Sequence, residues 1–144
     1  MTSVWSRIKE GARASDIALI DERTDRSISY ADLAGMVENA SQFQMTGKTV
    51  ATVFPIAVES VVLLLAISEA GGTVMPLNPD LTENEYIFFL KQNVDLVFVP
   101  DGEETSCVGR VASHLGIPLR TMSCTRTVEP RTAKKEPLEL EKKM

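Results

Sequence analysis

The residues that most resemble a phosphate-binding loop are Met45-Thr46-Gly47-Lys48-Thr49, where a glycine, a lysine and a hydroxyl group follow one another. In a P-loop these groups hold the phosphates of a nucleotide and its magnesium ion. That pattern requires a second glycine five residues before Gly47, and Gln42 occupies this position. It also requires a strand before the loop and a helix after it, and the hydrophobic pattern here predicts the reverse order. We therefore interpret this segment as a helix-to-strand turn.

The only histidine, His114, has no context for catalysis or metal binding. No GxSxG elbow or reactive-cysteine motif accompanies it, and no clustered carboxylates complete a zinc site. It falls in the last turn of a predicted helix, where a cation interacts favourably with the helix dipole. Cys107 and Cys124 are too far apart for a CxxC site and too few for a disulfide framework, so we expect two reduced thiols.

Two further motifs have structural explanations. The carboxylates of Asp101, Glu103 and Glu104 follow a predicted strand, where α/β sheets often place ligands, but a solvated turn leading into a helix explains them equally well. Gly71-Gly72 follows a helix, whereas a dinucleotide fingerprint follows a strand, so we expect a helix cap and close packing. The sequence thus identifies no catalytic, cofactor-binding or metal-binding residue.

The elements that would position these residues alternate along the chain. Two short apolar runs around a charged turn, Ile17 to Ile20 and Arg26 to Ser29, predict a β-hairpin. Four helices are then predicted: one from Ser29 to Ala40, one at 57–70, one that begins at the capping box of Thr82, and one at 105–115. Four strands are predicted between and after them, at 49–54, 73–77, 95–99 and 117–122. This order predicts an α/β fold, a layered domain with a mostly parallel sheet and helices on both faces.

Length and composition limit the classes of protein. With 144 residues the chain forms one domain, which we divide into an N-terminal segment (1–16), a folded part (17–122) and a charged tail (123–144) expected to be disordered. The net charge of −5 and the scattered basic residues exclude a nucleic-acid-binding surface. The longest apolar run, Val61 to Ile67, is too short to span a membrane, and no signal peptide is recognisable, so we expect a soluble intracellular protein.

Three blocks in order carry a resemblance to a known family. They are Ala18-Leu19-Ile20-Asp21 with Ile28 to Leu33, then Val50 to Pro55 with Glu59 to Ala66, and then Glu69 to Thr82, which contains Ala70-Gly71-Gly72 and Pro76-Leu77-Asn78-Pro79. Together they resemble the N-terminal portion of adenylate-forming (AMP-binding) acyl-CoA synthetases. Within this family, the sequence resembles fatty-acyl, coumarate and oxalate CoA ligases more than it resembles peptide-synthetase modules. The resemblance extends over about Ile17 to Met122 and implies an incomplete N-terminal subdomain of that fold.

The resemblance implies a reaction but no catalytic residue. Family members activate a carboxylic acid with ATP to an acyl-adenylate and then form a thioester with CoA, and the full-length proteins use ATP, Mg and CoA. The family's TSGTTGxPKG loop, YGxTE segment and C-terminal catalytic lysine do not occur in the sequence, and Lys134 and Lys135 lack the required context. We therefore expect no cofactor for this chain alone.

Three functions are compatible with these observations. The chain could be a truncated ligase that is inactive alone, a binding or regulatory module that pairs with a full-length ligase, or one part of a split ligase with a separately encoded remainder. The helix predicted at 57–70 is nearly all apolar and is expected to be buried. Where strands of an incomplete subdomain are missing, its face from Val61 to Ile67 is expected to be exposed, which predicts aggregation or a partner. We expect a cytoplasmic location, with the peroxisome as the alternative that the resemblance implies, although Lys142-Lys143-Met144 differs from a Ser-Lys-Leu signal.

Overall fold

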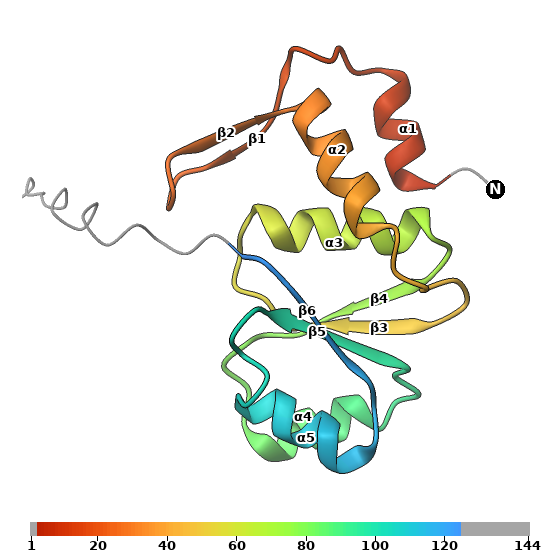
Figure 1. The fold of residues 1–144 in the computed structure, drawn as a ribbon, viewed down its shortest axis with the longest axis vertical. Coiled ribbons are helices and arrows are strands. Elements are labelled where there is room, and N and C mark those ends of the chain that lie inside the picture. The colour runs from red at the N-terminus through yellow and green to blue at the C-terminus, as the bar shows by residue number, and fades with distance from the viewer. Residues whose placement is uncertain (1–2, 125–144) are drawn as a thin grey trace, which may run out of the picture.

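The computed structural model describes residues 3–124, which form helices and strands in alternation (Figure 1). The predicted tail lies, beyond Cys124, outside the described residues. In chain order the elements are α1 (Val4–Glu10), β1 (Ile17–Asp21), β2 (Arg26–Ser29), α2 (Tyr30–Ala40), β3 (Thr49–Thr52), α3 (Val58–Glu69), β4 (Thr73–Pro76), α4 (Glu83–Leu90), β5 (Leu96–Pro100), α5 (Cys107–Leu115) and β6 (Leu119–Met122). Each predicted element of the hairpin and of the alternating region is present, with ends shifted by one or two residues.

Four of the strands form one parallel sheet in the order β4-β3-β5-β6. Thr49 pairs with Thr73 on one side of β3, and Ala51 pairs with Val97 on the other. The strands β1 and β2 form a separate antiparallel hairpin. Both findings confirm the predicted α/β class, with a hairpin that precedes a parallel sheet.

The helices lie in two layers around this sheet (Figure 1). The helix α3 covers one face, with α1 and α2 packed on it, and α4 and α5 cover the other face. Successive strand residues alternate between two cores, so Val50 and Phe98 pack toward α3 while Ala51 and Val97 pack toward α4 and α5. Because both faces are buried, these strands have continuous apolar sequences without polar alternation.

Local hydrogen bonds fix where the helices begin and end. The Ser29 hydroxyl accepts a hydrogen bond from the Asp32 N–H at 3.1 Å and caps α2. Thr82 and Glu85 form the predicted capping box of α4, with bonds of 3.2 and 2.8 Å. After α3, Gly71 has a φ of +86°, the left-handed conformation that glycine adopts without strain.

The N-terminal segment contains a helix, α1, that was not predicted from the sequence. Ser3 caps it by accepting the Ser6 N–H at 3.0 Å, and Trp5 is buried against the α3 layer. A helix of seven residues is too short to be stable alone, so its existence depends on this packing. The serine cap and the tryptophan were the sequence signals that could have indicated it.

The predicted burial of α3 is confirmed for most of the residues from Val61 to Ile67, and the exposure expected of this face is wrong for them. Five of them, Val62, Leu63, Leu65, Ala66 and Ile67, are buried. Only Leu64 is exposed, with Val61 half-buried. The reason is that α3 lies between the sheet and the helices α1 and α2, so most of its surface is covered.

Candidate functional site

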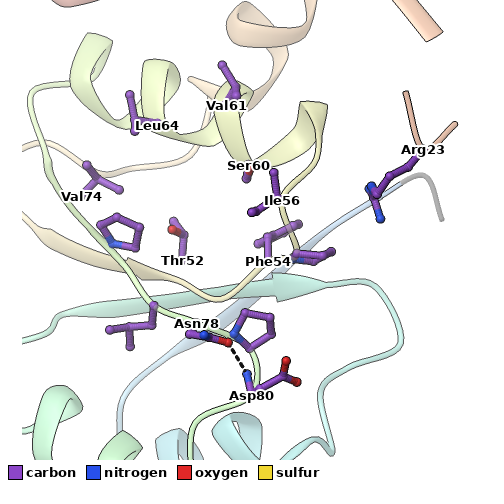
Figure 2. Close-up of a pocket in the computed structure, with 14 residues that line it drawn as sticks. Arg23, Thr52, Phe54, Ile56, Ser60, Val61, Leu64, Val74, Asn78 and Asp80 are labelled. Carbon is purple, nitrogen blue, oxygen red and sulfur yellow. Dashed lines mark hydrogen bonds between the residues drawn. The ribbon is translucent and has the colours of Figure 1, made fainter. Parts of the chain in front are cut away.

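A groove of about 740 Å³ lies between the N-terminal half of α3 and the edge strand β4 (Figure 2). Its walls are mainly apolar, because Phe54 and Leu77 lie there just after the ends of β3 and β4, while α3 contributes Val61 and Leu64. The lining residues are Arg23, Thr52, Phe54, Pro55, Ile56, Ser60, Val61, Leu64, Val74, Pro76, Leu77, Asn78, Pro79 and Asp80. The groove therefore suits an apolar group better than a phosphate or a metal ion.

Hydrogen bonds within the chain engage two neutral polar side chains of this groove, those of Ser60 and Asn78. The Ser60 hydroxyl donates to the Ala57 carbonyl at 2.6 Å and accepts from the Ala57 N–H at 3.3 Å, which caps α3. Asn78 Oδ1 accepts from the Asp80 N–H at 2.7 Å (Figure 2). The charged residues that line the groove are Arg23 and Asp80. No nucleophile, general base or metal-binding set is assembled among these lining residues.

A smaller hollow of about 220 Å³ lies at the carboxyl ends of β3 and β5, beside the N-terminus of α5. This is the point at which the strand order reverses, since α3 leads from β3 to β4 on one side and α4 leads back to β5 on the other. Crevices at such positions often bind ligands in α/β proteins. Glu103, Ser106 and Cys107 line it, together with the buried Tyr86.

The polar groups of this smaller hollow also stabilise the fold. The Tyr86 hydroxyl donates to the Asn78 carbonyl at 2.8 Å, and burial raises the pKa of its phenol. Ser106 caps α5 by accepting the Gly109 N–H. The lining thus offers a carboxylate, a capping hydroxyl and a thiol, and its residues include no histidine.

The structure confirms that Met45 to Thr49 is a turn between α2 and β3. The Gly47 N–H donates to the Gly71 carbonyl at 3.0 Å, and the Thr46 hydroxyl donates to the Ala70 carbonyl at 2.7 Å. Lys48 is exposed. The Gly47 N–H, which would contact phosphates in a P-loop, is therefore bonded to the chain just after α3 instead.

The remaining candidate residues of the sequence do not form one site, although Glu103 and Cys107 both line the smaller hollow. His114 is exposed in the last turn of α5, as predicted. Asp101 and Glu103 lie in the turn that leads from β5 toward α5. Neither cysteine is in a disulfide. Within residues 3–124 no group of three or more His, Cys, Asp and Glu side chains could hold a metal ion.

A buried ion pair was not predicted from the sequence. Arg26 Nη2 on β2 contacts both carboxylate oxygens of Glu59, at 3.2 and 3.0 Å, and Glu59 is 6% exposed. The Cys124 thiol lies 3.8 Å from the same carboxylate. One carboxylate thus joins the hairpin, α3 and the chain after β6. Its only sequence signal was an acidic residue at the start of an otherwise apolar helix.

A second carboxylate stabilises the hairpin turn. Asp21 Oδ1 accepts the Arg23 N–H at 3.0 Å, and the Asp21 side chain is buried. Burial alone would raise the pKa of Asp21, but hydrogen bonds from Thr24 and Arg23, with the nearby Arg23 charge, outweigh it and hold that pKa below its usual value. Asp21 is therefore a structural anion of the turn.

Comparison with known proteins decides the family. The model of the AMP-binding enzyme family matches residues 9–143. The chain belongs to this family. Over 97 residues it is 29% identical to an oxalate–CoA ligase from Arabidopsis thaliana, which corresponds to 63% of the chain and 19% of that protein. The sequence resemblance to the N-terminal portion of adenylate-forming CoA ligases is confirmed.

Solved structures show the same fold. Apo MatB from Rhodopseudomonas palustris superposes with a TM-score of 0.73 at 23% identity, over 85% of this chain and 26% of that one. A benzoate CoA ligase from Burkholderia xenovorans LB400 superposes with a TM-score of 0.71 at 20% identity, again over 85% and 26%. The chain therefore spans about a quarter of the length of these structures and about a fifth of the curated relative.

Proposed function

We propose that this chain is the N-terminal scaffold of an acid-CoA ligase. The complete ligase would activate a carboxylic acid with Mg-ATP to an acyl-adenylate and then pass the acyl group to CoA. Membership of the AMP-binding family and the match to an oxalate–CoA ligase support this reaction class. The chemistry would reside in polypeptide outside the segment described here, so the chain alone would be inactive.

One observation carries the scaffold role: the residues of the most specific matching block have structural tasks. A Cβ atom at Gly72 would lie 2.7 Å from the Met45 carbonyl oxygen, so glycine permits the close approach of two turns. The backbone carbonyl of Asn78 accepts a hydrogen bond from the Tyr86 hydroxyl, and Thr82 caps α4. This block thus shapes the joints between α3, β4 and α4, and it presents no catalytic group.

The relatives suggest the class of substrate. They are named as ligases of oxalate and benzoate, which are small carboxylic acids. We therefore propose a small organic acid as the substrate of the complete ligase. We also propose a cytoplasmic location, with the peroxisome as the alternative; within residues 3–124 no helix is long and apolar enough to cross a membrane.

A chimera tests the scaffold role. This chain would replace the matching quarter of the Burkholderia benzoate CoA ligase, and benzoyl-CoA formation would be measured with ATP, Mg²⁺ and CoA. The proposal predicts benzoyl-CoA from the chimera and none from the remainder of the benzoate ligase alone. A chimera that melts cooperatively like the parent ligase but forms no benzoyl-CoA would contradict the proposed role.

Pairing with a separate protein is the second candidate function, and the exposed apolar groove beside α3 favours it. In that case the chain would be a regulatory module or one part of a split ligase. Co-purification of a ligase polypeptide with the tagged chain would support pairing. Thioester formation on mixing the two would identify the split ligase, and a complex without this activity would identify the regulatory module.

A further inference from the structure

A further hollow, of about 580 Å³, lies between the β1–β2 hairpin and the N-terminal end of α3. We refer to it as the hairpin hollow. It borders the groove shown in Figure 2, with which it shares Arg23, Ile56 and Val61. Apolar side chains of β1, of the loop before α3 and of α3 form most of its lining, and the charges come from Asp21, Glu22 and Arg23. The hairpin hollow thus combines an apolar wall with a charged end.

The Asp21 carboxylate at this charged end has one hydrogen-bonded oxygen and one without a partner. Oδ1 accepts the Arg23 N–H at 3.0 Å, whereas no residue among 3–124 forms a hydrogen bond with Oδ2, which is buried. The whole residue is only 8% exposed. Strand alternation places its side chain on the same side of β1 as Leu19, which packs against the core on the α3 side of the sheet. Asp21 therefore brings to the hairpin hollow a buried carboxylate with an unused acceptor.

A buried acceptor of this kind costs free energy when it carries charge and lacks a donor. Burial raises the pKa of Asp21, but hydrogen bonds from Thr24 and Arg23, with the nearby Arg23 charge, outweigh it and hold that pKa below its ordinary value. The carboxylate is therefore ionised at neutral pH. Arg23 compensates the charge only in part, because its Nε lies 3.8 Å from Oδ1 and its side chain is 39% exposed. A donor that enters from the hollow would remove the remaining cost.

The single unused oxygen indicates which kind of donor fits. A guanidinium group binds a carboxylate best through two parallel bonds, which require both oxygens, and Oδ1 of Asp21 is already engaged. An ammonium group is a compact charge with three N–H donors, so one oxygen is enough for it. The exposed Glu22 adds a second negative charge at the hollow and offsets the charge of Arg23. The charged end therefore favours an ammonium group over a guanidinium group or an anion.

The apolar wall suits a carbon chain attached to that ammonium group. Ile20 is 68% exposed and Ile56 is 93% exposed, and both line the hollow. The stems of cationic groups pack along apolar surface of this kind while the charge meets a polar partner. The exposed side chains of Glu22 and Arg23 change rotamer within nanoseconds, so they leave a path to the Asp21 carboxylate.

We propose that the hairpin hollow is a binding site for a primary alkylammonium ion. The ammonium group donates a hydrogen bond to the Asp21 carboxylate, and the alkyl chain lies against Ile20, Ile56 and Val61. Such binding is independent of the proposed ligase reaction, because every residue of the hollow belongs to the chain described here.

Titration of the isotope-labelled 144-residue chain with n-butylammonium chloride tests this proposal at pH 7. NMR would follow the backbone amides from Ile20 to Arg23 and that of Ile56, with 1-butanol as the neutral probe of equal chain length. The proposal predicts saturable shifts and a Kd at least about tenfold lower for butylammonium than for 1-butanol, because the alcohol brings no charge to the carboxylate. Butylammonium should also bind at least about fivefold more tightly than methylammonium, since each CH₂ group removed from water lowers the Kd.

Two substitutions in the same turn form a matched pair. Asp21→Asn removes the charge at the hollow and should raise the Kd for butylammonium at least about tenfold. Asp25→Asn is the control, because it removes the same charge from a residue that does not line the hollow. The φ of Asp25 is 56°, a left-handed conformation that asparagine also tolerates. This control should change the Kd by less than about twofold, as expected for a screened surface charge.

Three results would overturn the proposal. Equal Kd values for butylammonium and 1-butanol would show that the hollow is purely apolar. Equal weakening by Asp21→Asn and Asp25→Asn would show a general attraction of cations to the turn. The absence of saturable shifts with butylammonium would show that Asp21 Oδ2 is only a hydration site. If Asp21→Asn does not fold, the comparison of butylammonium with 1-butanol and methylammonium in the natural chain decides.

Discussion

Arg26 and Glu59 lie 33 positions apart in the chain, and Arg26 Nη2 contacts both carboxylate oxygens of Glu59 at 3.2 and 3.0 Å. The pair joins the hairpin, which is outside the parallel sheet, to the first turn of α3. Glu59 is 6% exposed, so its charge is largely removed from water and depends on Arg26 for compensation. The pair therefore helps to hold the hairpin on the α3 layer, together with the apolar packing of Ile28 and Leu19.

Replacing one partner of this ion pair should lower the free energy of unfolding. Glu59→Ala leaves Arg26 without its carboxylate, and because the arginine side chain is 26% exposed we expect a loss of about 2 kcal/mol, below the 3–5 typical of fully buried pairs. Urea unfolding followed by circular dichroism measures it. The control Glu38→Ala, at an exposed position of α2, should change stability by less than about 0.5 kcal/mol. Equal effects of the two substitutions would contradict a structural role for the pair.

The stability of the hairpin turn should depend on pH through Asp21. Its folded-state pKa is held below the ordinary value of 3.8, so its contribution is present above that value and is lost as the pH falls through the folded pKa. Asp21→Asn should therefore destabilise the chain at pH 7, and the difference from the natural chain should shrink toward pH 3. Urea unfolding at pH 7, 5 and 3 measures this. A difference that does not vary with pH would show that the charge of Asp21 is not the cause.

Two glycines should respond to alanine in opposite directions. At Gly72 a Cβ would lie 2.7 Å from the Met45 carbonyl oxygen and 3.1 Å from Ile67 Cγ2, so Gly72→Ala should cost about 1–3 kcal/mol. At Gly35, inside α2, nothing lies within 4 Å, and Gly35→Ala should stabilise the chain by about 0.5–1 kcal/mol. Thermal unfolding measures both. If Gly72→Ala is neutral, the close approach of the two turns does not explain that glycine.

The buried tyrosine joins the proline-rich loop after β4 to α4. Tyr86→Phe removes a 2.8 Å hydrogen bond to the Asn78 carbonyl and should cost about 1 kcal/mol. The half-buried Tyr30 provides the control, because Tyr30→Phe should have a smaller effect on the free energy of unfolding. An equal loss of unfolding free energy from both substitutions would contradict a stabilising role for the hydrogen bond from the Tyr86 hydroxyl to Asn78.

Features that depend on neighbouring residues in the sequence could be predicted. The capping box of Thr82 and Glu85, the left-handed Gly71 and the buried face of α2 follow from local spacing. The strands could also be predicted from their continuous apolar sequences, because a parallel sheet is buried on both faces.

Features that depend on residues distant in the sequence could not be predicted. Apolar residues fill nearly all of α3, so the sequence alone did not show which side α1 and α2 would cover and which would remain exposed at Leu64. The Arg26–Glu59 pair depends on the same docking of the hairpin. The candidate site was not visible from motifs because its lining is apolar and comes from several elements.

The exchange of labelled pyrophosphate into ATP tests the central claim most directly, because it reports acid adenylation without the thioester step. It would be measured with benzoate for the 144-residue chain, for the remainder of the benzoate CoA ligase, and for the two joined in one polypeptide. The scaffold account predicts exchange only in the joined protein. Reproducible, acid-dependent exchange by the purified 144-residue chain would contradict it.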